Sequence, residues 1–167
     1  MADAYQYALR LLAGQDYSVF KLTKKLRQKG FADAEIQDAL AQVEQKGYLR
    51  PQAYLRHRIL QLARKGEAAA LIQKQLDFEH LPTSLAAIEE VLRDEGISAD
   101  QQILALLQKK LGHTTELTPA LAKKVISFVL RKGHGLHQCR QVLQQFLPDA
   151  TIHREEGATS PEDLSSG

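Results

Sequence analysis

The sequence predicts an all-α protein: three tandem repeats of a three-helix unit that form an elongated, curved array. Apolar residues recur at helical spacing along nearly all of the 167 residues, and strand-like alternation does not occur. Amphipathic stretches end at regularly placed glycines, often after a lysine, as is typical of helix C-termini. Spaced apolar residues recur with a period of about 50, which indicates a helical repeat array.

Side-chain signals mark where the individual helices begin. Ser18, Ser98 and Thr118 are suited to N-cap positions, because a hydroxyl can accept a hydrogen bond from a free backbone N–H. Pro51 and Pro119 are suited to first helical positions. With the glycine stops, these signals predict helices at residues 3–13, 18–29, 33–46, 51–65, 67–78, 84–95, 98–111, 119–132 and 136–147.

The helices group in threes, and the third helix of each group shows the repetition. Its spaced apolar residues are Ile36, Ala39 and Val43, then Leu85, Ile88 and Leu92, then Leu136, Cys139 and Leu143. We therefore expect repeats at residues 1–49, 50–97 and 98–150. Residues 151–167 are rich in Ser, Gly and acidic residues with little to bury, so we expect a disordered acidic tail.

The formal net charge of +2 hides an alternation along the chain. Residues 1–66 carry +6, residues 67–97 carry −5, residues 98–154 carry +5 and the remaining tail carries −4. Two basic regions separated by an acidic one suit contact with a long anionic partner at both ends. Charge alone is also compatible with chance clustering on solvated helix faces.

Catalytic and metal-binding signatures are absent from the sequence. It has no Walker-type phosphate loop, no dinucleotide-binding glycine motif and no serine nucleophile elbow. The cluster from His134 to Cys139 lacks a fourth metal ligand, and we interpret it as a buried cysteine with His134 and His137 at the surface. We therefore expect a protein that is not an enzyme and has neither a cofactor nor a metal.

The composition indicates a cytoplasmic protein, and we expect a monomer. No apolar run approaches the roughly 18–20 residues of a membrane span, and the first residues do not form a signal peptide. A single cysteine excludes an internal disulfide and fits a reducing compartment.

Three helices place basic side chains opposite an apolar stripe. Such bases can neutralise phosphates or pair with carboxylates of a protein partner. Helix 51–65 stands out, because its outer side also carries a tyrosine and a histidine, which stack or bury well in interfaces. The candidate partner- or DNA-binding residues are Lys21, Lys24 and Lys25 on helix 18–29, Tyr54, Arg58, Arg64 and Lys65 on helix 51–65, and Lys124 and Arg131 on helix 119–132.

Several stretches resemble RecX regulatory proteins. The segment from Tyr7 to Ala13, followed by Ser18, Leu22, Leu26 and the stop Lys29-Gly30-Phe31, is similar to that family's opening repeat. The segment Gly47-Tyr48-Leu49, followed by Tyr54, Arg58 and the stop Arg64-Lys65-Gly66, is similar to the entry of its second repeat. Residues 124–133 resemble its closing repeat. Two features depart from the family: Arg50 stands where acidic residues are usual, and the second repeat has Asp77 to Pro82 in place of a Lys-Gly stop.

The resemblance implies three three-helix repeats that bind in the groove of the RecA filament on single-stranded DNA. It also implies restraint of RecA's ATPase, strand-exchange and co-protease activities. The geometry of the helix faces, and not a matched family site, leads us to expect a central contact at Tyr54, Arg58, Arg64 and Lys65. The lysines of helix 18–29 and the basic residues of helix 119–132 would add flanking contacts. Two other functions stay open: a helical module that binds single- or double-stranded DNA without RecA, and an adaptor that recognises only an acidic protein.

Overall fold

The computed structural model describes residues 2–147, and in that range every regular element is a helix, with no strand. Each predicted helix is confirmed to within two residues at either end. None of the helices in this part of the chain is long and apolar enough to cross a membrane. The helices are α1 (Ala4–Gly14), α2 (Val19–Lys29), α3 (Asp33–Gln45), α4 (Pro51–Arg64), α5 (Ala69–Phe78), α6 (Leu85–Asp94), α7 (Ala99–Leu111), α8 (Pro119–Arg131) and α9 (Leu136–Phe146).

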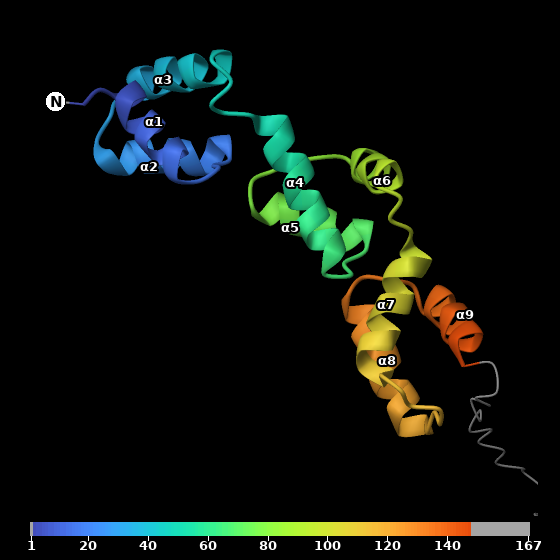
Figure 1. Ribbon diagram of the computed structural model, residues 1–167. Coiled ribbons are helices and arrows are strands. Elements are labelled where there is room, and N and C mark those ends of the chain that lie inside the picture. Colours follow the sequence, from blue (N-terminus) through green and yellow to red (C-terminus); the bar gives the residue numbers. More distant parts are fainter. Residues whose placement is uncertain (1, 148–167) are drawn as a thin grey trace, which may run out of the picture.

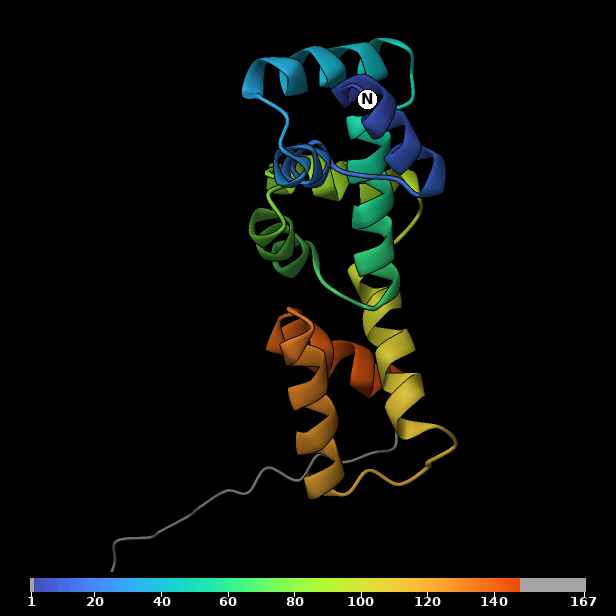
Figure 2. The same cartoon turned by 90° about the vertical axis from the view of Figure 1, so that its left-hand side faces the viewer.

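The helices form three units that follow one another along a single axis, so the predicted elongated array of three-helix repeats is confirmed (Figure 1). In the view turned by 90°, α4 and α7 follow one another along the long axis (Figure 2). Helices α5 and α6 pack beside α4, and α8 and α9 pack beside α7. Residues 148–150 of the third expected repeat and the expected tail at 151–167 lie outside the described residues.

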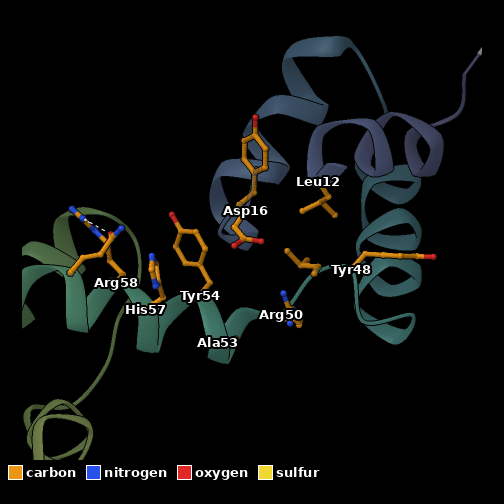
Figure 3. A pocket seen from close by; sticks show the side chains of 11 residues that line it. Leu12, Asp16, Tyr48, Arg50, Ala53, Tyr54, His57 and Arg58 are labelled. Atoms are coloured by element: carbon orange, nitrogen blue, oxygen red, sulfur yellow. Dashed lines mark hydrogen bonds between the residues drawn. The ribbon is translucent and has the colours of Figure 1, made fainter. Parts of the chain in front are cut away.

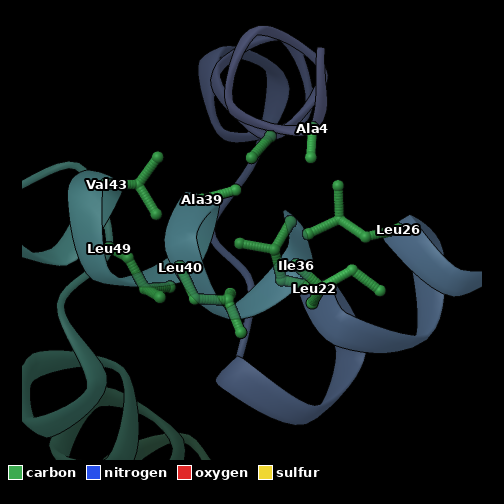
Figure 4. Close-up of a cluster of buried hydrophobic side chains, with 9 residues drawn as sticks. Ala4, Leu22, Leu26, Ile36, Ala39, Leu40, Val43 and Leu49 are labelled. Atoms are coloured by element: carbon green, nitrogen blue, oxygen red, sulfur yellow. The ribbon is translucent and has the colours of Figure 1, made fainter. Parts of the chain in front are cut away.

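Each unit has a hydrophobic core of its own. In the first unit, Leu22 and Leu26 of α2 meet Ile36 of α3 beneath α1, and Leu49 closes the core from the segment that leads into α4 (Figure 4). The second core forms around Ile59, Ile72, Leu76 and Ile88, and the third around Ile103, Leu107, Val129 and Leu143. Burying one such side chain contributes about 1.5–3 kcal/mol, so each core stabilises its own unit.

The predicted helix starts at Ser18, Ser98 and Thr118 are present, and Ser84 caps α6 in the same way. Each hydroxyl accepts a hydrogen bond from the backbone N–H three residues later, and Pro51 and Pro119 occupy first helical positions. The second unit ends its middle helix differently from the other two. His80 there adopts φ +58°, whereas the first and third units have Gly30 and Gly133 at this turn, both with positive φ.

The predicted repeat of the third helices is present at two of its three positions. Ala39, Ile88 and Cys139 are buried, and so are Val43, Leu92 and Leu143. The first position differs: Ile36 is buried, whereas Leu85 and Leu136, the first residues of α6 and α9, are 38% and 41% exposed. Because α3 begins at Asp33, this position lies inside α3 but at the very start of α6 and α9.

The second and third units are joined by hydrogen bonds as well as by packing. The Gln102 side-chain amide donates to the carbonyls of Ala63 and Glu67, both at 2.9 Å, which satisfies acceptors at the end of α4. The backbone N–H of Ala68 donates to the Lys132 carbonyl at 2.8 Å. These contacts, made by buried or partly buried groups, hold α4–α5 against α7 and the α8–α9 turn.

His134 belongs to this junction, which corrects its predicted place at the surface. Its side chain is 5% exposed, and its Nε2 atom lies 2.8 Å from the Gly66 carbonyl oxygen. Since that oxygen only accepts, Nε2 carries the proton and donates it. Cys139 is buried and His137 exposed, as predicted. Burial lowers the pKa of His134, and the hydrogen bond to Gly66 opposes this shift.

We expect the protein to lose stability as the pH falls from 7.5 to 5.5, and His134→Gln to remove much of that loss. Because the pKa of His134 is lowered in the folded state, the unfolded chain takes up a proton at a higher pH than the folded chain does. The free energy of unfolding therefore decreases once the pH drops below 6.5, the ordinary pKa of histidine. Melting temperatures at both pH values measure the effect. The control is His137→Gln, which changes an exposed histidine of α9; an equal reduction in both variants would contradict the prediction.

Candidate partner-binding surface

A pocket of about 370 Å³ lies between the first unit and α4. Its lining combines aromatic, basic and apolar groups from α1, the α1–α2 loop and both sides of the α3–α4 connection (Figure 3). Tyr54 points from α4 toward the first unit, and Leu12 and Asp16 lie opposite it. The pocket lining also includes Tyr17, Tyr48, Arg50, His57, Arg58 and Gln61.

Arg58 is engaged inside the protein. Its Nε and Nη2 atoms donate to the two carboxylate oxygens of Glu79 at 2.9 and 2.6 Å, and Nη1 donates to Gln61 at 3.1 Å. The paired side chains of Arg58 and Glu79 are only 22% and 15% exposed. The sequence placed Arg58 among the outward-facing bases of its helix. This is corrected, because folding brings the turn after α5 against α4 and supplies a carboxylate.

The ion pair shifts both groups toward their charged forms. Hydrogen bonding to Glu79 raises the pKa of Arg58, with burial opposing the shift. Hydrogen bonds from Arg58 lower the pKa of Glu79, again against burial, and Gln75 and the charge of Lys21 contribute smaller decreases. A two-pronged pair of this kind fixes the α5–α6 turn on α4, next to the pocket.

We expect Glu79→Gln to destabilise the protein by about 1–3 kcal/mol at neutral pH, because it leaves a half-buried guanidinium without its anion. Glu79 has a lowered pKa in the folded state, so its contribution is complete above the ordinary value of 4.5 and disappears as the pH falls through the folded value. Urea unfolding of wild type and variant should therefore differ at pH 7 and converge in acid.

The control for this measurement is Glu95→Gln. Glu95 pairs with Arg56, but these side chains are 36% and 41% exposed, so solvent screens the pair and its loss costs within about 0.5 kcal/mol. Equal effects of the two substitutions would mean that the partial burial of the Arg58–Glu79 pair contributes nothing.

Arg64 and Lys65 do not join the pocket that Tyr54 lines. They are exposed and border a different hollow, of about 330 Å³, together with Lys109 and the apolar side chain of Leu106. Ten residues of helix separate Tyr54 from Arg64, which is about 15 Å along the axis. The central contact expected from the sequence is therefore two sites at opposite ends of α4.

The flanking basic faces are exposed as predicted. Val19 shares the apolar stripe of α2 with Leu22 and Leu26 by its spacing, but it is 39% exposed at the start of the helix. Beyond Arg58, none of the basic candidates forms an ion pair with another residue in the range 2–147. These unpaired bases lie on all three units: Lys21, Lys24 and Lys25 on α2, Arg64 and Lys65 at the end of α4, and Lys124 and Arg131 on α8.

Sequence reasoning missed several surface aromatic residues. Phe78 is 86% exposed, Tyr48 54% and Phe20 43%, although residues of these types are usually at least half buried. A signal existed for Phe78: it stands within the segment that replaces the usual Lys-Gly stop. No group of three or more possible metal ligands occurs among the described residues.

Comparisons with known proteins place the chain in a family. Residues 4–42 match the family model described as RecX, first three-helix domain, which spans α1, α2 and most of α3. A regulatory protein RecX of Trichlorobacter lovleyi is 30% identical over an alignment of 152 residues that covers 86% of this chain and 96% of the relative. The chain belongs to the RecX family.

Other RecX relatives match over most of their length. The regulatory protein RecX of Pasteurella multocida is 30% identical over 133 residues, covering 79% of this chain and 80% of its own. That of Haemophilus influenzae is 28% identical over 131 residues, covering 78% and 86%. These RecX proteins are named as regulatory proteins, and three helical units with dispersed basic faces suit contact with a large partner.

Proposed function

We propose that this RecX-family protein binds RecA filaments on single-stranded DNA and restrains their ATP hydrolysis, strand exchange and co-protease activity. The observation that carries the proposal is the distribution of unpaired bases. They lie on α2, α4 and α8, one helix from each unit of an elongated molecule. A nucleoprotein filament is long, repetitive and anionic, so a chain that offers unpaired bases on each of its three units can contact several protomers at once.

The joint between the second and third units supports the same function. Gln102, His134 and Ala68 make hydrogen bonds across it, so the faces on α4 and α8 are held at a fixed distance. A partner with a regular repeat selects for such fixed spacing, because each contact already formed raises the effective concentration at the next.

The experiment that tests the proposal is ATP hydrolysis by RecA from the same organism, on single-stranded DNA, with the purified protein titrated in at moderate salt. We expect inhibition at or below one molecule for each RecA protomer, and weaker inhibition as the salt concentration rises. A heat-unfolded sample is the control. Full ATPase activity at a several-fold excess of folded protein would overturn the proposal.

The alternative is a DNA-binding module that acts without RecA. One observation favours it: the pocket beside α4 is lined by Tyr17, Tyr48 and Tyr54 together with Arg50 and His57, and such groups can stack on bases and contact phosphate. Tight binding to naked DNA, with RecA activity unchanged, would establish this function in place of the first.

A further inference from the structure

An unusual surface patch lies where α2 of the first unit meets the end of α5 in the second. We call it the aromatic–lysine patch. Phe78, the last residue of α5, is 86% exposed, and Val19 and Phe20 at the start of α2 are 39% and 43% exposed. Its members are the aromatic and apolar residues Val19, Phe20, Phe78 and His80 and the lysines Lys21, Lys24, Lys25 and Lys74.

The patch is assembled across the junction by side-chain contacts. The rings of Phe20 and His80 stack with centroids 3.9 Å apart and an interplanar angle of 22°. His80 follows Glu79, which Arg58 clamps through two hydrogen bonds, so the turn that carries Phe78 is fixed on α4. Lys74 precedes Phe78 by four residues and therefore shares its face of α5.

An almost fully exposed phenylalanine has no role in folding that would retain it. Burying an aromatic ring of this kind against a partner removes about 150–250 Å² from water. Aromatic residues near the middle of a contact carry much of the binding energy when they enter a well-packed pocket. Exposed apolar groups rimmed by charged residues mark interaction sites rather than inert surface.

The surrounding charges indicate which kind of partner fits. None of the four lysines is paired within the range 2–147, so carboxylates on the partner would neutralise them. Asp77, next to Phe78, is exposed and would repel a phosphate backbone brought close to the ring. Charges of both signs around an apolar centre are typical of a protein interface and not of a nucleic-acid groove.

We infer that the aromatic–lysine patch is a docking site for a protein surface that has an apolar pocket edged by carboxylates, and that Phe78 is its anchor. Resting on the proposed function, this surface belongs to the protein of the filament rather than to its DNA. The unpaired bases of α4 and α8 lie outside the patch, so docking at Phe78 leaves them available for other contacts.

The test compares Phe78→Ser, Phe78→Trp and Leu136→Ser with the wild-type full chain in the RecA ATPase titration. Leu136 is 41% exposed on the third unit and serves as the matched control. We expect Phe78→Ser to raise the half-inhibiting concentration about tenfold to thirtyfold, and Phe78→Trp and Leu136→Ser to stay within about threefold of wild type. Circular dichroism and melting temperature should not change for Phe78→Ser, because the ring is exposed.

Binding to a labelled single-stranded oligonucleotide without RecA completes the test, and we expect Phe78→Ser to bind it as wild type does. Wild-type inhibition by Phe78→Ser would overturn the inference while leaving the proposed function intact. An equal loss of oligonucleotide binding would show that Phe78 contacts DNA and would overturn it too. Absence of inhibition by the wild type would instead overturn the proposed function, and the inference with it.

Discussion

Gly133→Ala is expected to destabilise the protein by about 2–4 kcal/mol, because it strains the backbone and forces two helices apart. Gly133 has φ +88°, in the left-handed region that favours glycine. An added Cβ would lie 2.9 Å from the Leu71 Cβ and 3.4 Å from that of Ala68. These atoms are attached directly to the backbone around the start of α5, so relief requires movement of the helix and disturbs the Ala68–Lys132 hydrogen bond.

The matched control is Gly47→Ala, which isolates the backbone effect. Gly47 has φ +76° but nothing within 4 Å of an added Cβ, so we expect a cost of about 1 kcal/mol. Urea unfolding followed by circular dichroism gives both values, with the slope checked for a single transition. If the two variants lose the same free energy of unfolding, the close contact of Gly133 with α5 adds no destabilisation to the backbone effect. The packing argument is then wrong.

Replacing Arg64 and Lys65 together by glutamate is expected to weaken the proposed inhibition of RecA at least about tenfold, since each repelled or lost ionic contact costs about 1–3 kcal/mol. Both side chains are exposed and without an ion-pair partner in the described part of the chain, so folding should be little affected. The control is the double variant Arg10→Glu and Arg140→Glu, which makes the same charge change on exposed residues outside the basic faces.

The salt dependence of inhibition separates two mechanisms for the same residues. If Arg64 and Lys65 contact phosphates, replacing them by glutamine should make affinity less dependent on salt. The negative slope of log affinity against log salt should then become smaller in magnitude by about one for each residue. If they pair with protein carboxylates, affinity falls with a smaller change in slope. Equal inhibition by both glutamate double variants would remove Arg64 and Lys65 from the binding surface.

Arg58 needs a different variant, because a single charge reversal would break its internal pair with Glu79. The double exchange Arg58→Glu with Glu79→Arg keeps a pair while reversing the charge at residue 58.

The sequence by itself determined the helices, their order and the three-unit architecture. Hydroxyl caps, first-turn prolines and glycine stops act within a few residues, and the apolar stripes with Leu22, Ile59 or Val129 follow from helical periodicity alone. The same local signals placed the lysines of α2 and α8 on exposed faces. The exposure of these lysines depends little on contacts with distant parts of the chain.

Only the tertiary structure decided which residues the junctions use. Arg58 and Glu79 are 21 residues apart in the sequence, and His134 and Gly66 are 68 residues apart. No local pattern therefore predicts that Arg58 is paired or that His134 is buried. The exposure of Leu85, Leu136 and Phe78 was settled in the same way, by how neighbouring helices pack. A periodic sequence specifies a face for each residue, but whether that face meets solvent, a carboxylate or another unit depends on contacts between distant segments.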